Sequence, residues 1–588
     1  MDKLQLTKKR ILRSRLSIAL LSIVNLVTVH KNNSGTKILI FLRFFLLLAL
    51  VFALQRNVYG QDDWNKEGDL EDVEIEIVKE RQITLPQATR NFEKIPPRPA
   101  ESGKPSFLYD FTPFTFQASQ INPAIRPLKL KQEAASNVYG GYLSAGYGNY
   151  VSPYLEGFIN SRRDMNKLVG AHGFLRSSGK GPVDGKNSAS GSSGISVYGK
   201  AFSEFFSLSA EAGFENRSTH FYGYTPGSDV SAGNIRQSFN LFTLQGELSN
   251  AKNSDFAYKL GAEFSYLADK YDARESEAGF DFSSSYDLND QSAIAVEAGY
   301  YLINRKDFMI EVKPRSLFTV NPRYEFYPVE DLKLSAGIVA AFENDTLDNK
   351  DVHAYPDLRA SYPLSPSVDI TASLTGGIEK VSLQSLSNEN LWLAPNIPVF
   401  HTNKLLDLQA ALHTKIGNKI AVNGGFSLAS LKNLYFFRNT KVDPSKFTVQ
   451  YDDVTNRTNF FASLGFAQTE TFKILLRGDV YSYSTDIDEA WHRPTYKITG
   501  ETSLNVYDKL LVDVNLIAQG GMKAFDPVTD IIVKLDPAFD LNVRTEYLIS
   551  DSFSIFAQFN NLTSNEYPVF LNYPVRGFQV LGGLTWSF

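Results

Sequence analysis

From about residue 137 to the end, the chain repeats short segments in which apolar and polar residues alternate. In the segment AFDLNVRTEY, Phe539, Leu541 and Val543 share one face, while Asp540 lies on the other. A period of two is typical of a β-strand whose two faces meet different surroundings. No stretch of this region keeps a period of 3.6 residues. The sequence therefore predicts an all-β region, and SVDITASLTG, LLDLQAALHTKI and FKILLRGDV repeat the same pattern.

The predicted strands are about nine to thirteen residues long, which is the length that crosses a bilayer at a tilt. Soluble sandwiches and propellers also alternate, but their strands are usually nearer five or six residues. The connections between the strands alternate in length. The tight links are predicted at 363–367, 416–419, 469–471, 507–509 and 549–552. The longer links are predicted at 177–194, 220–237, 378–402, 438–457, 519–536 and 561–575.

Short turns at one rim and long loops at the other are typical of an outer-membrane β-barrel. Lipid permits only a closed sheet, because an open edge would leave backbone groups without hydrogen-bond partners. We therefore predict an all-β fold over 137–588: a transmembrane antiparallel barrel of about 22 strands, within a range of 18–22. Both ends of the barrel are expected on the periplasmic side, and the cell outer membrane is the expected location.

The first 136 residues differ from the barrel region. Residues 37–54 contain a long apolar run after basic residues, and Val58 and Gly60 are small enough for a cleavage site. We interpret residues 1–60 as a signal peptide of a Gram-negative outer-membrane protein, with a membrane anchor as the alternative. Residues 61–136 are acidic and then rich in proline, so we expect an extended segment that lies in the periplasm or threads into the lumen.

Composition narrows the possible chemistry. The chain of 588 residues has no cysteine, so disulfides and thiolate metal sites are absent, and its net charge of −5 does not favour nucleic acid as a partner. We predict no catalytic residues, no metal site and no cofactor, and we do not expect an enzyme. The seven histidines lack the spacing of metal ligands; they are His30, His172, His220, His353, His401, His413 and His492.

The C-terminal stretch FSIFAQFNNLTSNEYPVFLNYPVRGFQVLGGLTWSF resembles the end of a TonB-dependent outer-membrane receptor. The matching parts are NNL at Asn560–Leu562, YP at Tyr573–Pro574 and RGF at Arg576–Phe578. The resemblance implies a receptor barrel that mediates uptake across the outer membrane. The plug domain that this family carries before its barrel has no recognisable counterpart, because only 61–136 stand between the leader and the barrel.

Two further stretches are candidate interaction sites. Leu70–Val78 is a β-prone strip in the position of a TonB box, with Val73, Ile75, Ile77 and Val78 as its apolar residues; an acidic, solvated linker is the alternative. The second is a loop rich in aromatic residues, which could bind a ligand outside the cell or could simply pack within the barrel rim. Its candidate binding residues are His220, Phe221, Tyr222 and Tyr224.

The last strand is expected to close the barrel against the first, near Val138–Gly148. Its outward residues Leu584, Trp586 and Phe588 resemble the insertion signal that the outer-membrane assembly machinery recognises. Expected partners are therefore outer-membrane lipid, that machinery, and TonB or another periplasmic or outer-membrane protein. Transport is the favoured function, and a structural or assembly subunit of a larger outer-membrane complex is the alternative.

Overall fold

The computed structural model describes residues 140–588 apart from 162–165, 226, 252–254, 346, 348–349 and 470. The signal-peptide and N-terminal-segment predictions lie outside the described residues. No helix among the described residues is long and apolar enough to cross a membrane.

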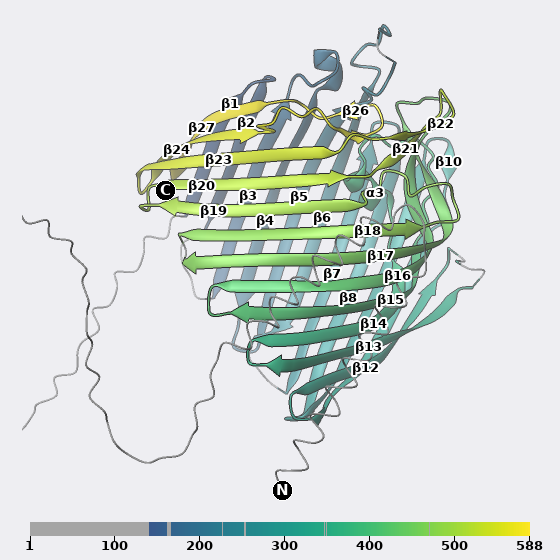
Figure 1. Cartoon of the computed structure of the whole chain (residues 1–588), viewed down its shortest axis with the longest axis vertical. Coiled ribbons are helices and arrows are strands. Elements are labelled where there is room, and N and C mark those ends of the chain that lie inside the picture. The colour runs from purple at the N-terminus through teal and green to yellow at the C-terminus, as the bar shows by residue number, and fades with distance from the viewer. Residues whose placement is uncertain are drawn as a thin grey trace, which may run out of the picture. The chain divides into compact units, whose positions relative to one another are not determined.

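The described residues form one large antiparallel sheet that closes on itself (Figure 1). The sheet has 23 strands in this part of the chain; the two-residue β10 (Ile310–Glu311) pairs only with the end of β9, which leaves 22 around the barrel. The first eleven barrel strands are β1 (Gly141–Gly148), β2 (Ser152–Asn160), β3 (Lys167–Ser178), β4 (Ser190–Phe202), β5 (Phe206–His220), β6 (Arg236–Asn250), β7 (Phe256–Asp269), β8 (Arg274–Asn289), β9 (Ser292–Asp307), β11 (Arg315–Val329) and β12 (Leu332–Glu343). The other eleven are β13 (Val352–Ser365), β14 (Val368–Glu379), β15 (Thr402–Ile416), β16 (Ile420–Asn439), β17 (Phe447–Thr469), β18 (Phe472–Ser484), β19 (Tyr496–Val506), β20 (Leu510–Gly520), β23 (Ala538–Ser550), β24 (Phe553–Asn560) and β27 (Gln579–Ser587).

The remaining elements lie in the longer connections. They are the 3-10 helix η3 (Gly185–Ser188), the helix α3 (Leu383–Glu389), the hairpin β21 (Lys523–Asp526) with β22 (Ile531–Lys534), and the small pair β25 (Pro568–Phe570) with β26 (Tyr573–Pro574). Tight turns join the strands at one rim, which we call the short-turn rim, and all of these extra elements lie at the other, the long-loop rim.

The barrel closes where β27 pairs with β1, as predicted. The register runs from Tyr142 opposite Ser587 to Gly148 opposite Leu581. At this seam the inward side chains of Ser144 and Thr585 are buried, and their hydroxyl oxygens lie 3.3 Å apart. The closed sheet of 22 antiparallel strands confirms the predicted fold class and strand number.

The two faces of the wall differ in the way the alternation predicts. The outward residues form a belt of exposed apolar side chains, and Leu584, Trp586 and Phe588 of the last strand belong to it. The inward face is polar and internally paired. Arg323 there lies 2.7 Å from Glu297 and 3.5 Å from Asp357. An apolar belt around a closed sheet is the arrangement that a bilayer requires.

Two details of the sequence prediction were wrong. The strands are longer than nine to thirteen residues on one side of the barrel, where β16 has 20 residues and β17 has 23. The connection predicted at 438–457 is consequently only the short stretch 440–446. The alternating pattern continues above the membrane because these two strands pair with each other as far as Asn439 and Phe447, and that pairing needs no lipid.

Candidate functional site: a cap in the mouth of the barrel

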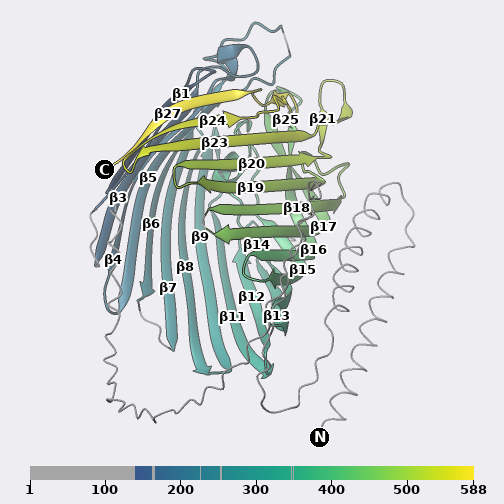
Figure 2. The same cartoon turned by 60° about the vertical axis from the view of Figure 1, so that its left-hand side comes forward.

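Figure 2 shows two sides of the barrel wall, with β4 to β9 on the left and β14 to β20 on the right. The connection 380–401 between β14 and β15, which we call the inner loop, folds into the long-loop end of the lumen, where Figure 1 labels its helix. It carries α3, whose apolar residues Leu383 and Leu386 are buried. Ser382 caps the helix: its hydroxyl accepts a hydrogen bond from the amide of Ser385 at 3.2 Å, and the Ser385 hydroxyl accepts one from the amide of Ser382 at 2.9 Å. This reciprocal box lets a helix of seven residues form.

A buried carboxylate on the opposite wall holds the start of α3. Glu275 of β8 accepts hydrogen bonds from the amides of Leu383, at 2.9 Å, and of Gln384, at 2.8 Å. These are two of the amides that the helix itself cannot satisfy. The Glu275 side chain is only 2% exposed, so it is committed to this contact. The inner loop is therefore attached to a strand that lies five pairings around the barrel from β14.

Further polar contacts fix the loop to the same wall. The Ser265 hydroxyl donates to the Gln384 side-chain oxygen at 2.7 Å, and Arg217 donates to the Ser387 hydroxyl at 3.3 Å. Lys380 forms ion pairs with Glu277 and, at 3.3 Å, with Glu263. The contacts come from β5, β7 and β8, so the loop crosses the lumen instead of lying along its own strands.

A second cluster clamps the two ends of the inner loop together. Arg315 donates to the Val381 carbonyl at 2.9 Å, to Nδ1 of His401 at 2.8 Å and to both oxygens of Asp345. The same His401 nitrogen accepts the Val381 amide at 3.1 Å. Because Nδ1 accepts two hydrogen bonds, it carries no proton, and His401 is neutral.

The electrostatics of this clamp favour that protonation state. Burial and the adjacent Arg315 charge lower the pKa of His401 to about 4. Burial opposes ionisation of Asp345, but its hydrogen bonds and charge interaction with Arg315 outweigh that effect and hold the pKa of the carboxyl below its usual value. The clamp is thus an Arg–carboxylate pair with a neutral imidazole beside it.

Aromatic side chains from three connections and one strand belong to the same buried cluster as the apolar residues of α3. Tyr573 is fully buried, and its ring centroid lies 4.2 Å from that of Trp392, 4.7 Å from that of Tyr222 and 5.7 Å from that of Phe447. The Tyr573 hydroxyl donates to the Ser445 carbonyl. This aromatic cluster and the inner loop together form what we call the cap.

The cap packs as a protein core does and not as loose loops do. Val381, Leu386, Leu393 and Ile397 of the inner loop join one continuous buried apolar cluster with residues of β6, β7, β16, β17 and the 561–578 connection. A barrel of this many strands is wide enough to leave an aqueous channel if nothing fills it. The cap therefore obstructs the lumen at the long-loop rim.

The structure places the predicted aromatic-loop residues within or beside the cap. Phe221 is 1% exposed and Tyr222 is 8% exposed, so neither ring is presented to solvent. His220 is the last residue of β5, and the Tyr224 hydroxyl donates to Asp184 at 2.6 Å. The packing explains the position of these side chains, and ligand binding by this loop stays a prediction.

Of the other predicted site residues, the structure describes those of the last strand. Leu584, Trp586 and Phe588 face outward at the seam, and their role as an insertion signal stays a prediction. Val73, Ile75, Ile77 and Val78 lie outside the described residues. No group of three or more metal-ligating side chains occurs in the described part of the chain.

Sequence reasoning missed the residues that hold the cap, above all Glu275, Arg315 and Asp345. The stretch SLQSLSNEN did carry a signal for α3, because a serine N-cap precedes Leu383 and Leu386 at helical spacing. The partners of α3 gave no such signal, since they are ordinary inward polar residues of distant strands.

No protein-family model matches the chain, and no curated protein matches it by sequence. Solved structures do match its fold. The FrpB iron transporter from Neisseria meningitidis is 10% identical with a TM-score of 0.60, and the match covers 77% of this chain and 82% of that one. The siderophore receptor PirA from Acinetobacter baumannii is 9% identical with a TM-score of 0.59, covering 78% and 81%.

A third neighbour is the ferric-catecholate import receptor Fiu from Escherichia coli K12, at 9% identity and a TM-score of 0.57, with 77% and 82% covered. The barrel is thus similar to those of TonB-dependent receptors, which confirms the predicted resemblance at the level of the fold. The apolar belt and closed sheet are of the outer-membrane type, as expected for the predicted location.

Proposed function

We propose that this protein is a receptor-like conduit that mediates uptake across the outer membrane, with its outer mouth closed at rest by the cap. The observation that carries the proposal is the inner loop crossing a polar-lined lumen and docking on Glu275. A purely structural barrel has no need of a polar passage, and an open porin has no need of a packed seal across it.

The cargo class to test first is the ferric siderophore. The neighbouring structures are an iron transporter, a siderophore receptor and a ferric-catecholate import receptor. Energised uptake would use TonB or a similar periplasmic protein, and Leu70–Val78 is the stretch proposed to contact it. Deletion of Leu70–Val78 is expected to abolish uptake while leaving the amount of barrel in the membrane unchanged.

The direct test of the conduit compares the wild-type barrel with a variant in which 381–400 are replaced by a short glycine–serine turn. In planar bilayers, the wild type should be mostly closed and the variant should conduct continuously. In cells, the variant should admit large antibiotics that the wild type excludes. Equal conductance of the two proteins would contradict a closing role for the inner loop.

A subunit role in a larger outer-membrane complex is the alternative. It predicts a stoichiometric protein partner after purification in mild detergent, together with unchanged uptake of every tested cargo when the gene is deleted.

A further inference from the structure

Two basic side chains stand directly opposite each other on the outer wall of the barrel, near the long-loop rim. Arg274 begins β8, Lys306 lies near the end of β9, and their Cα atoms are register partners in the antiparallel ladder. Both residues are exposed. They face outward, because Phe280 and Tyr300, each six residues away on the same strand, belong to the exposed apolar belt.

Within the described residues, the one carboxylate placed directly beside this pair of like charges is Glu311 of β10, the register partner of Lys306. Like charges directly opposite each other destabilise a β-ladder. Within the described residues, neither Arg274 nor Lys306 forms a side-chain hydrogen bond or an ion pair. Glu311, the register partner of Lys306 on β10, also forms no ion pair with it in this part of the chain. The two cations therefore remain available to an anion from outside the protein.

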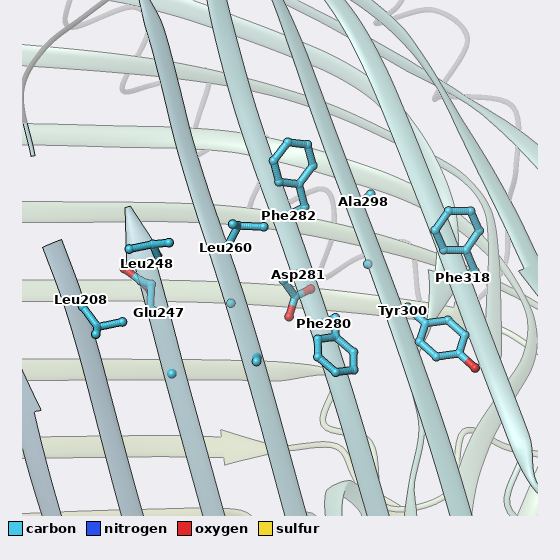
Figure 3. Close-up of a pocket in the computed structure, with 14 residues that line it drawn as sticks. Leu208, Glu247, Leu248, Leu260, Phe280, Asp281, Phe282, Ala298, Tyr300 and Phe318 are labelled. Carbon is cyan, nitrogen blue, oxygen red and sulfur yellow. The ribbon is translucent and has the colours of Figure 1, made fainter. Parts of the chain in front are cut away.

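An apolar hollow of about 460 Å³ lies on the same wall, closer to the middle of the belt (Figure 3). One row of outward register partners runs across it from Gly246 through Ala262 and Phe280 to Tyr300 and then Phe318. The first two members of the row are small and the last three are aromatic. The hollow is therefore formed where small side chains stand next to large aromatic ones. Its other outward lining residues are Leu208, Leu248, Leu260, Phe282 and Ala298.

The hollow and the basic pair are spaced as the two ends of one lipid would be. Six residues of β8 separate Arg274 from Phe280, and six residues span about 20 Å along a strand. Strands of such barrels tilt by roughly 40°, so the depth difference is about 15 Å. That is about half of the roughly 30 Å hydrocarbon core, the region that acyl chains occupy. An unfilled hollow in this belt would forfeit dispersion contacts, so an acyl chain is favoured there.

We propose that this wall is a binding site for a lipid that carries a phosphate monoester, with the phosphate between Arg274 and Lys306 and an acyl chain in the hollow. A phosphate monoester carries about −1.5 to −2 charges at neutral pH, so two adjacent cations attract it more strongly than they attract a phosphodiester headgroup, which carries one negative charge. The long-loop rim is the outer one in barrels of this type, so the lipid belongs to the outer leaflet.

The test is native mass spectrometry of the full barrel in mild detergent with three lipids: bis-phosphorylated lipid A, the same lipid A after removal of its phosphates, and phosphatidylglycerol. The wild type should retain one molecule of the phosphorylated lipid A. The double variant Arg274→Gln with Lys306→Gln should bind it at least ten-fold more weakly. Gly246→Leu, which fills the hollow without changing charge, should also weaken binding.

The matched control is Lys313→Gln with Lys350→Gln, which removes two exposed positive charges from the loops and not from the wall. It should bind like the wild type. Heat-modifiable migration on a gel shows that each variant is a folded barrel. Equal retention by the wall and control variants would overturn the site, and equal retention of dephosphorylated lipid A or phosphatidylglycerol would overturn the assignment to a phosphate monoester.

Discussion

At the scale of single residues, the cap depends on a few buried polar groups that each satisfy several backbone or side-chain partners. Glu275 accepts two amides of α3, and Arg315 contacts Val381, Asp345 and His401 at once. Hydrogen bonds to charged groups are worth more than neutral ones, and an unsatisfied buried partner is costly. Small changes at these positions should therefore loosen the inner loop without unfolding the barrel.

We predict that Glu275→Gln weakens docking of the inner loop by about 2 kcal/mol, the cost of losing a charge-assisted hydrogen bond. The amide has one acceptor oxygen in place of two, so either Leu383 or Gln384 loses its partner. Single-channel recordings should show openings that are at least ten-fold more frequent than in the wild type. Glu247→Gln, on the same wall but only partly buried and paired with Lys259, is the control and should leave the openings unchanged.

Acid should also open the cap. The docked His401 has a pKa of about 4, below the ordinary value near 6.5, so the undocked loop takes up a proton more readily. Docking is then fully stable above about pH 6.5 and weakens as the pH falls toward 4. Asp345 acts in the same direction, since its lowered pKa means that stability is lost as the pH falls through it.

The charged groups that interact with His401 are Arg315, Asp345 and Lys380. Channel openings should therefore be more frequent at pH 4.5 than at pH 7.5. In His401→Asn the side-chain oxygen can still accept from Arg315, and nothing at this position titrates in that range. An equal pH response of this variant and the wild type would show that the response comes from elsewhere.

At the scale of elements, the inner loop acts as a strap across the lumen rather than as a surface loop. Its ends are held at the clamp and its middle at the far wall. Ser265 and Gln384 are in direct contact across the lumen, since their side-chain oxygens lie 2.7 Å apart, and they suit a reversible cross-link. The chain has no cysteine, so an engineered pair would have no competing thiol.

We predict that Ser265→Cys with Gln384→Cys is bridged by a short bis-methanethiosulfonate reagent, which spans the gap left by the shortened side chain at 384 and keeps the cap closed. Cross-linked protein should neither conduct nor take up cargo, and a reductant should restore both. Each single cysteine variant serves as the control. Undiminished uptake by the cross-linked double variant would mean that cargo passes without movement of α3.

The strands were largely predictable from the alternating pattern, and the docking of the loops was not. The tight links predicted at 363–367 and 416–419 contain the observed turns 366–367 and 417–419, because a change of side-chain period marks a turn locally. The docking of α3 joins residues 108 positions apart, Glu275 and Leu383, and no local pattern encodes that pairing. The upper ends of β16 and β17 were missed because pairing above the membrane keeps the same period.

At the scale of the whole molecule, the barrel wall has the same fold as the walls of the compared receptors. The cap, made of the barrel's own loops, obstructs its long-loop end. The inward ion pairs, such as Arg477 with Asp479 at 2.8 Å, keep the rest of the lumen polar. The described residues place the seal at the long-loop rim. A second obstruction, from the N-terminal segment 61–136 threading into the lumen, stays a prediction.

Deleting 61–130 should raise permeability to large antibiotics if that segment contributes to the seal. The increase should be greater in a barrel that also lacks 381–400 than in one with an intact cap, because two obstructions in series would then both be gone. Cell survival on vancomycin plates measures the effect. Unchanged single-channel conductance after the deletion would assign the whole seal to the cap.

The positions of the tryptophans allow opening of the cap to be followed by fluorescence. The chain has four tryptophans, of which Trp392 belongs to the aromatic cluster, Trp491 packs beside Phe525, and Trp586 faces outward. With Trp64, Trp491 and Trp586 replaced by phenylalanine, the tryptophan emission of the protein, excited selectively over tyrosine, would come from the cap alone. A red shift and greater quenching by acrylamide would then follow opening in real time, with no dye attached.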